Sequence, residues 1–203
     1  MLTFAVSVFF LLITPGPGVL TTAGVAAAYG FRNGLGYMSG IVIGAQVVMI
    51  CVASGLAAMV FAIPYVRVTL LVASVAYLFY LAFVIAMSGN RIGFISVDKS
   101  PKFWQGFALS VINPKAYAVS TTLFSGFAFW PENLAVENTL KCLIVLSIAI
   151  PIHLIWLYAG AALKKLELSP RTARLINFAM AGALVAVVAL ALMSQFSASA
   201  SPP

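Results

Sequence analysis

Long hydrophobic stretches separated by short polar segments are the main feature of the chain. Residues 33–66, 68–90, 142–163 and 175–203 contain no Lys, Arg, Asp or Glu. About 20 apolar residues are enough for a helix to cross the hydrocarbon core of a bilayer. Because the stretches are continuously apolar and do not alternate with polar residues, they indicate membrane-spanning helices.

Six spans are predicted from the apolar runs and from the Pro, Gly and charged residues between them. The expected ranges are 2–29, 36–62, 66–87, 103–129, 141–163 and 174–194. The first run has no basic residue before Arg32 and is interrupted by Pro and Gly. We therefore expect it to remain in the protein as a span and not to be removed as a signal peptide.

The charged residues are few and unevenly distributed. The chain is 63% hydrophobic and 7% charged, against roughly a quarter charged in soluble domains. The connections after spans one, three and five carry eight basic residues, namely Arg32, Arg91, Lys99, Lys102, Lys164, Lys165, Arg171 and Arg174. The opposite connections carry only Arg67 and Lys141. Because cytoplasmic loops are enriched in Lys and Arg, we expect an inner (plasma) membrane protein with both termini in the periplasm.

The spans divide into two equal halves. A single transmembrane domain is expected over residues 1–195, with halves at 1–90 and 103–195 and a flexible tail at 196–203. Because each half has three spans, a repeat that relates them must insert them in opposite orientations. The predicted fold class is an all-α integral membrane protein with six transmembrane helices in two inverted three-helix repeats.

Spans one and four, which correspond in the two halves, are both interrupted by proline. The motifs are Thr14-Pro15-Gly16-Pro17-Gly18 and Asn113-Pro114-Lys115. A Thr or Asn before Pro is typical of a helix N-terminus, so each motif is expected to restart a helix inside the membrane. Paired interruptions of this kind point to a transporter site. The residues of both motifs, together with Gln46, are therefore the candidate substrate-binding residues.

Lys115 is the charged residue expected inside a span. An unpaired Lys at the bilayer centre costs roughly 2.5 to 3.5 kcal/mol, and the helix starts add further positive potential. The four acidic residues are all expected in loops; they are Asp98, Glu132, Glu137 and Glu167. A substrate carboxylate is therefore the expected partner of Lys115. The alternative is that Lys115 only snorkels or binds backbone carbonyls.

The expected lack of acids inside the membrane also limits the substrate. Metal ions and strongly cationic substrates are disfavoured, because hard cations need several oxygen ligands. An α-ammonium group is expected to bind carbonyls near Ile13 and Ile112, assisted by Gln46 or Asn113. We expect no cofactor and no bound metal.

His153, the only histidine, lies in span five just after Pro151. The chain has no phosphate-binding loop of the Walker type, so the proton gradient is the expected energy source for transport. Histidine titrates near neutral pH, which makes His153 a candidate proton relay. A hydrogen bond between two helices is the alternative role.

Small residues indicate close helix packing. Gly36, Gly40 and Gly44 form two overlapping small-xxx-small steps, which allow another helix to approach span two. Cys51 and Cys142 lie in apolar runs without a Cys-x-x-Cys spacing, so they are expected to be buried structural thiols.

In its interrupted spans and its glycine positions, the chain resembles the lysine and threonine exporter family (LysE/RhtB type). Members of this family are small six-span bacterial inner-membrane proteins that export amino acids. The shared features are Pro15-Gly16-Pro17, the turn at 30–34, Gly40 and Gly44, Tyr77-Leu78-Phe79-Tyr80-Leu81, Gly106-Phe107 and Asn113-Pro114-Lys115. The family usually continues Pro-Gly-Pro with Asn, where this chain has Gly18. Some members carry an acid in span two, where this chain has Ala45 and Gln46.

Residues and resemblance together predict a secondary transporter that exports neutral amino acids or related small zwitterions by alternating access. Its expected partners are the small-molecule substrate and the lipid bilayer. Nucleic acid is not an expected partner, and the sequence leaves open whether the protein forms a homo-oligomer. Two alternatives are kept. One is a membrane-embedded thiol redox carrier using Cys51 and Cys142, and the other is an intramembrane hydrolase with Lys115 as base for Ser110 or Ser120. On a regular helix neither serine shares the face of Lys115.

Overall fold

The computed structural model describes residues 1–63, 100–166 and 169–199, together with scattered positions between 65 and 87. The regular elements in this part of the chain are all helices. They are α1 (Leu2–Ile13), α2 (Pro17–Tyr29), α3 (Phe31–Ala53), α4 (Leu56–Phe61), α6 (Phe103–Ile112), α7 (Pro114–Gly126), α8 (Leu134–Lys165) and α9 (Pro170–Ser199). The predicted third span at 66–87 lies partly outside the described residues. The connection at 88–99, Glu167 and residues 200–203 lie wholly outside them.

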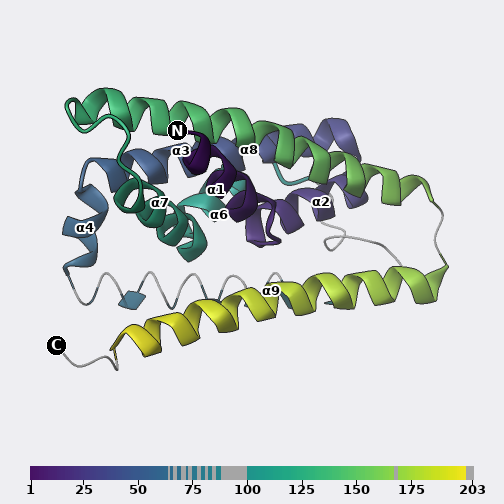
Figure 1. The fold of residues 1–203 in the computed structure, drawn as a ribbon. Coiled ribbons are helices and arrows are strands. Elements are labelled where there is room, and N and C mark those ends of the chain that lie inside the picture. The colour runs from purple at the N-terminus through teal and green to yellow at the C-terminus, as the bar shows by residue number, and fades with distance from the viewer. Residues whose placement is uncertain are drawn as a thin grey trace.

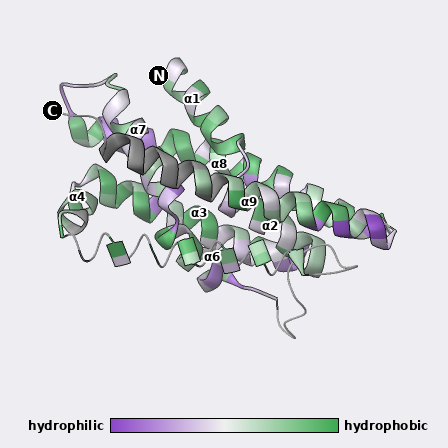
Figure 2. Cartoon of the chain, turned by 90° about the horizontal axis from the view of Figure 1, so that it is seen from below, coloured by the Kyte–Doolittle hydropathy of each residue, from purple (hydrophilic) through white to green (hydrophobic). Residues whose placement is uncertain are grey.

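Among the described residues, two helices are candidate membrane spans, and a bent pair of helices gives a third if it counts as one span. Helices α3 and α8 are each long and apolar enough to cross a bilayer. Helices α1 and α2 qualify as one span when taken together, although the chain bends by 52° between them. Figure 2 shows hydrophobic residues along most of the length of these helices. The predicted arrangement of six helices in two inverted repeats stays a prediction.

The two predicted interruptions are present, but the first lies two residues later than expected. Helix α2 begins at Pro17, with Gly16 as its extended N-cap. The hydroxyl of Thr14 does not cap this helix; it donates to the Phe10 carbonyl of α1 at 2.7 Å. Thr14 therefore ends α1, and the correct restart is Gly16-Pro17. Proline fits the first helical position because its missing N–H would have no partner there.

The second interruption follows the predicted pattern at Asn113. This residue alone separates α6 from α7, and its side-chain oxygen accepts the Lys115 backbone N–H at 3.0 Å. Satisfying a free N–H in this way is the normal role of an Asn N-cap.

Helix α3 packs against α6 through glycine, and against α2 and α8. A Cβ on Gly40 would collide with the Phe103 carbonyl oxygen, and one on Gly106 with the Tyr37 carbonyl oxygen. A Cβ on Gly44 would lie 2.7 Å from the Ser110 Cβ. A Cβ on Gly36, in contrast, would meet none of the described residues within 4 Å. Close helix packing is therefore found at Gly40 and Gly44 but not at Gly36.

Three of the predicted spans begin earlier in the chain than expected, and one of them is α9, which begins at Pro170 and not at 174. Helix α3 begins at Phe31, not at 36, because Gly30 makes the turn with φ 88° and leaves Arg32 in the first turn of the helix. Left-handed backbone of this kind favours glycine. Helix α8 begins at Leu134, not at 141, because the Asn133 side chain caps it by accepting the Val136 N–H at 3.1 Å.

The early start of α8 corrects the placement of Glu137 and Lys141, which the sequence pattern assigned to a loop. Their side chains are 3% and 2% exposed and form an ion pair at 2.6 Å. Glu137 also accepts the backbone N–H groups of Phe129 and Trp130, and Lys141 donates to the carbonyls of Phe124 and Phe127. The pair therefore fixes the connection after α7 to the first turns of α8. Figure 1 shows that α8 runs along the bundle, with α9 on the opposite side of the view.

Candidate functional site

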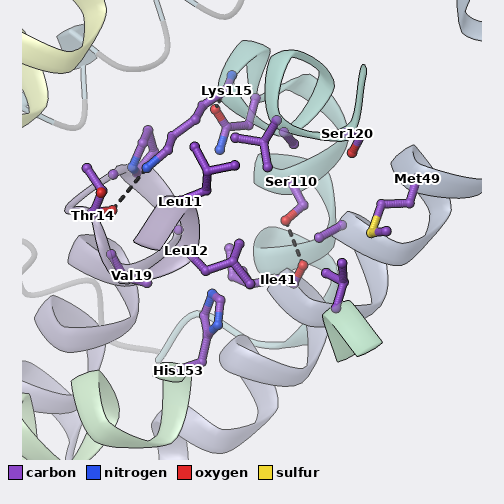
Figure 3. Close-up of a pocket in the computed structure, with 18 of the residues that line it drawn as sticks. Leu11, Leu12, Thr14, Val19, Ile41, Met49, Ser110, Lys115, Ser120 and His153 are labelled. Carbon is purple, nitrogen blue, oxygen red and sulfur yellow. Dashed lines mark hydrogen bonds between the residues drawn. The ribbon is translucent and has the colours of Figure 1, made fainter. Parts of the chain in front are cut away.

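A pocket lies between the two interruptions, at the meeting of α1, α2, α3, α6, α7 and α8 (Figure 3). Its empty volume is about 660 Å³, a figure that includes the open space at its mouth. Most of the wall is apolar, and these residues are Leu11, Leu12, Val19, Ile41, Ala45, Met49, Ala116, Val119, Leu123 and Val145. Ser110 and Ser120 add hydroxyl groups.

Seven of the predicted site residues line this pocket: Thr14, Gly16, Pro17, Gly18, Asn113, Lys115 and His153. The predicted residues Pro15, Pro114 and Gln46 are not among the lining residues. Gln46 follows Ala45 by one residue, which is about 100° around a helix, and its amide instead approaches the Met49 sulfur at 3.9 Å. The structure thus brings together both helix starts, the lysine and the histidine.

Lys115 reaches from the first turn of α7 to the end of α1. Its ammonium nitrogen donates to the Thr14 carbonyl oxygen at 3.0 Å (Figure 3). A Cβ on Gly16 would lie only 2.9 Å from that nitrogen, so Gly16 provides the space for the lysine. The contact is of the kind that the alternative interpretation of Lys115 expects. An ammonium has three donors, so this single bond does not exhaust its capacity.

His153 reaches the same pocket from α8. It is 7% exposed, and its Nδ1 lies 2.8 Å from the Ala149 carbonyl oxygen. Its other nitrogen faces the first turn of α2, because a Cβ on Gly18 would lie 3.7 Å from Nε2. Figure 3 shows His153 and Lys115 on different sides of the pocket.

Ser110 and Ser120 both line the pocket with Lys115, although a regular helix would separate them. Asn113 interrupts the helix between Ser110 and Lys115, so the regular spacing does not hold there. The Ser110 hydroxyl donates to the Ile41 carbonyl at 2.7 Å, and the Lys115 ammonium binds Thr14. Cys51 and Cys142 are free thiols, each partly buried.

The sequence pattern missed the α3 wall of the pocket. Ile41, Ala45 and Met49 recur every four residues and therefore share one face of the helix. The signal for this face was the neighbouring Gly40 and Gly44, which mark where α6 approaches. In an apolar span, the residues of a pocket wall and those of a lipid-facing surface are both apolar, so the sequence does not distinguish them.

Interrupted apolar helices that enclose a pocket are typical of membrane transport proteins. The chain belongs to the LysE type translocator family, which matches residues 9–196. Together with the apolar helices, this makes it a multi-pass inner-membrane protein.

The chain is also similar to two proteins named cysteine/O-acetylserine efflux protein, from Escherichia coli (strain K12) and Shigella flexneri serotype 5b (strain 8401). Each is 31% identical over 126 residues, which are 62% of this chain and 63% of the relative. The match therefore spans less than two thirds of these relatives. No solved structure matches the chain.

Proposed function

We propose that the protein exports small neutral amino acids from the cytoplasm, driven by the proton gradient. The single observation that carries the proposal is the pocket in which two helix starts, Lys115 and His153 meet inside an apolar bundle. The relatives named for efflux of cysteine and O-acetylserine suggest substrates of that size and charge. Membership of a translocator family favours transport over the redox carrier and the hydrolase.

The substrate carboxylate binds between Lys115 and the first turn of α2. With Pro17 at the first helical position, the free N–H groups of this turn belong to Gly18 and Val19. The Leu20 N–H is already bonded to the Gly16 carbonyl. Two free amides and the positive end of the helix dipole attract an anion, and Lys115 adds a full charge. The second helix start, at Asn113 and Pro114, adds positive potential from α7.

The apolar wall accommodates the substrate side chain. Described acidic residues do not line the pocket, so an additional positive charge on the substrate would have no countercharge there. Neutral side chains are therefore favoured over cationic ones. Alternating access of two inverted three-helix halves would open the pocket to each side of the membrane in turn, with His153 as the proton relay and both termini in the periplasm.

Export by cells tests this proposal. Cells that produce the wild-type protein are loaded with dipeptides containing cysteine, alanine, threonine or leucine, and the free amino acids and O-acetyl-L-serine in the medium are measured. We expect cells with the wild-type protein to release more of at least one of these compounds than cells without the protein. Cells with Lys115→Ala should release no more than cells without the protein. Lys165→Ala, which removes an exposed lysine at the end of α8, is the matched control and should export normally. Normal export by membrane-inserted Lys115→Ala would contradict the proposal.

A further inference from the structure

The hydrogen bond of His153 determines which of its ring nitrogens can accept. Nδ1 lies 2.8 Å from the Ala149 carbonyl oxygen, and a carbonyl oxygen only accepts hydrogen bonds. Nδ1 therefore carries the hydrogen, and the neutral ring presents Nε2 as an acceptor. The side chain is more than nine-tenths buried, and His153 and Gly18 both line the pocket. Nε2 lies on the side of Gly18, and none of the described residues forms a hydrogen bond with it.

Two glycines at the start of α2 leave space for the two basic side chains. A Cβ on Gly16 would lie 2.9 Å from the Lys115 ammonium, and one on Gly18 would lie 3.7 Å from His153 Nε2 and 3.3 Å from Ile41 Cγ2. A side chain at position 18 would therefore crowd Nε2. Because Gly18 has no side chain, the first turn of α2 has a donor on one side, at Lys115, and an acceptor on the other, at His153.

We propose that His153 Nε2 accepts a hydrogen bond from the α-ammonium group of the substrate, and that the driving proton binds the same lone pair in exchange. This inference rests on the proposed function and names the substrate class more narrowly. An α-amino acid carries its ammonium and carboxylate on one carbon, so a donor and an acceptor on two sides of one helix turn match both groups. The substrate class is the neutral α-amino acid with a free amine.

The single lone pair of Nε2 couples the two movements. It cannot hold a proton and accept a hydrogen bond at the same time. When the substrate leaves towards the periplasm, Nε2 takes a proton from that side. When the pocket faces the cytoplasm, Nε2 gives this proton to water and accepts the ammonium N–H of the next substrate. Among the described residues that α1, α2, α3, α6, α7 and α8 place around the pocket, Lys115 is the other titratable or charged group.

Two substrate analogues test the amine contact. Labelled O-acetyl-L-serine is displaced from the purified full-length protein by 3-acetoxypropanoate, which lacks the amine, and by O-acetylethanolamine, which lacks the carboxylate. We expect the wild type to bind 3-acetoxypropanoate at least roughly tenfold more weakly than O-acetyl-L-serine, the loss typical of a hydrogen bond to a charged group. His153→Phe should bind O-acetyl-L-serine and 3-acetoxypropanoate with similar affinity. It should still bind O-acetyl-L-serine more tightly than O-acetylethanolamine.

Two further variants separate the amine contact from the proton and from folding. His153→Gln keeps a hydrogen-bond acceptor but does not titrate, so it should retain the amine preference while proteoliposomes containing it move O-acetyl-L-serine without counter-movement of protons. Gly18→Ala leaves His153 in place and covers Nε2, so it should weaken the amine preference even if His153→Phe fails to fold. An exposed tyrosine of α8 supplies the control Tyr158→Phe, which should match the wild type.

The outcomes distinguish this inference from the proposed function. An unchanged amine preference in folded His153→Phe, or in Gly18→Ala, would overturn the role of Nε2 while leaving export by the wild type intact. Proton movement that persists in His153→Gln would overturn the exchange at this nitrogen. A wild type that exports no amino acid from cells would overturn the proposed function itself.

Discussion

Replacing Gly40 by alanine should destabilise the protein, whereas the same change at Gly36 should not. Both residues lie in α3. A Cβ on Gly40 would collide with the Phe103 carbonyl oxygen and would lie 2.8 Å from the Phe107 backbone nitrogen, whereas one on Gly36 would meet no atom within 4 Å in the part of the chain that the structure describes. Because the obstacles at Gly40 are backbone atoms, no side-chain rotation relieves the collision and α6 must move.

The expected difference follows from two opposing effects. Alanine stabilises a helix by about 1 kcal/mol relative to glycine, and both variants share this gain. Inserting a methyl group into a packed interface typically costs about 1 to 3 kcal/mol. Movement of α6 would also strain the Ser110 to Ile41 hydrogen bond of 2.7 Å, a bond of a type worth about 1 kcal/mol. Gly40→Ala should therefore be about 1 to 4 kcal/mol less stable than Gly36→Ala.

Chemical unfolding of the purified proteins in detergent micelles measures this difference. Tryptophan fluorescence is a suitable signal, because Trp104 lies on α6 and Trp156 on α8. Equal free energies of unfolding for the two variants would refute the close packing of α3 on α6. A more stable Gly40→Ala would refute it as well.

Three further predictions concern the helix caps, the ion pair and the topology. Asn113→Ala should cost about 1 kcal/mol of stability and impair export. Asn133→Ala should cost a similar amount of stability but leave export intact. Unfolding and export assays of the two variants measure these effects. Lys141→Met should lower the thermal unfolding midpoint in detergent more than Thr139→Ala, an exposed change in the same turn, because it leaves Glu137 buried without its countercharge; equal midpoints would contradict this. A C-terminal alkaline phosphatase fusion should be active, and an active cytoplasmic reporter at the same position would contradict a periplasmic C-terminus.

The sequence predicted the interruptions because their causes are local. Proline lacks an N–H and opposes the preceding turn of helix wherever it stands, and Asn113 caps α7 as expected. Thr14 was misplaced because its hydroxyl has two possible partners, and the carbonyl of its own helix is the one it binds. Hydropathy placed the start of α8 too late because Glu137 and Lys141 resemble loop residues, although each neutralises the other in the structure.

The pocket itself needed the structure because its contacts join distant parts of the chain. Lys115 and Thr14 are 101 residues apart, and Ser110 and Ile41 are 69 apart. Gly18 and His153 meet only because α2 packs against α8. The spacing of residues along the chain does not reveal such contacts. The position of His153 Nε2 beside Gly18 and the α3 wall of the pocket were therefore not predicted.

Equilibrium binding to the purified protein most directly tests the claim that a substrate carboxylate binds Lys115 in this pocket. Labelled O-acetyl-L-serine and the neutral amino acids are titrated against the wild type, Lys115→Ala and Lys165→Ala in detergent. We predict saturable binding of at least one of these compounds by the wild type and by Lys165→Ala, with affinity reduced at least roughly tenfold in Lys115→Ala. Equal affinity in folded Lys115→Ala would contradict the account.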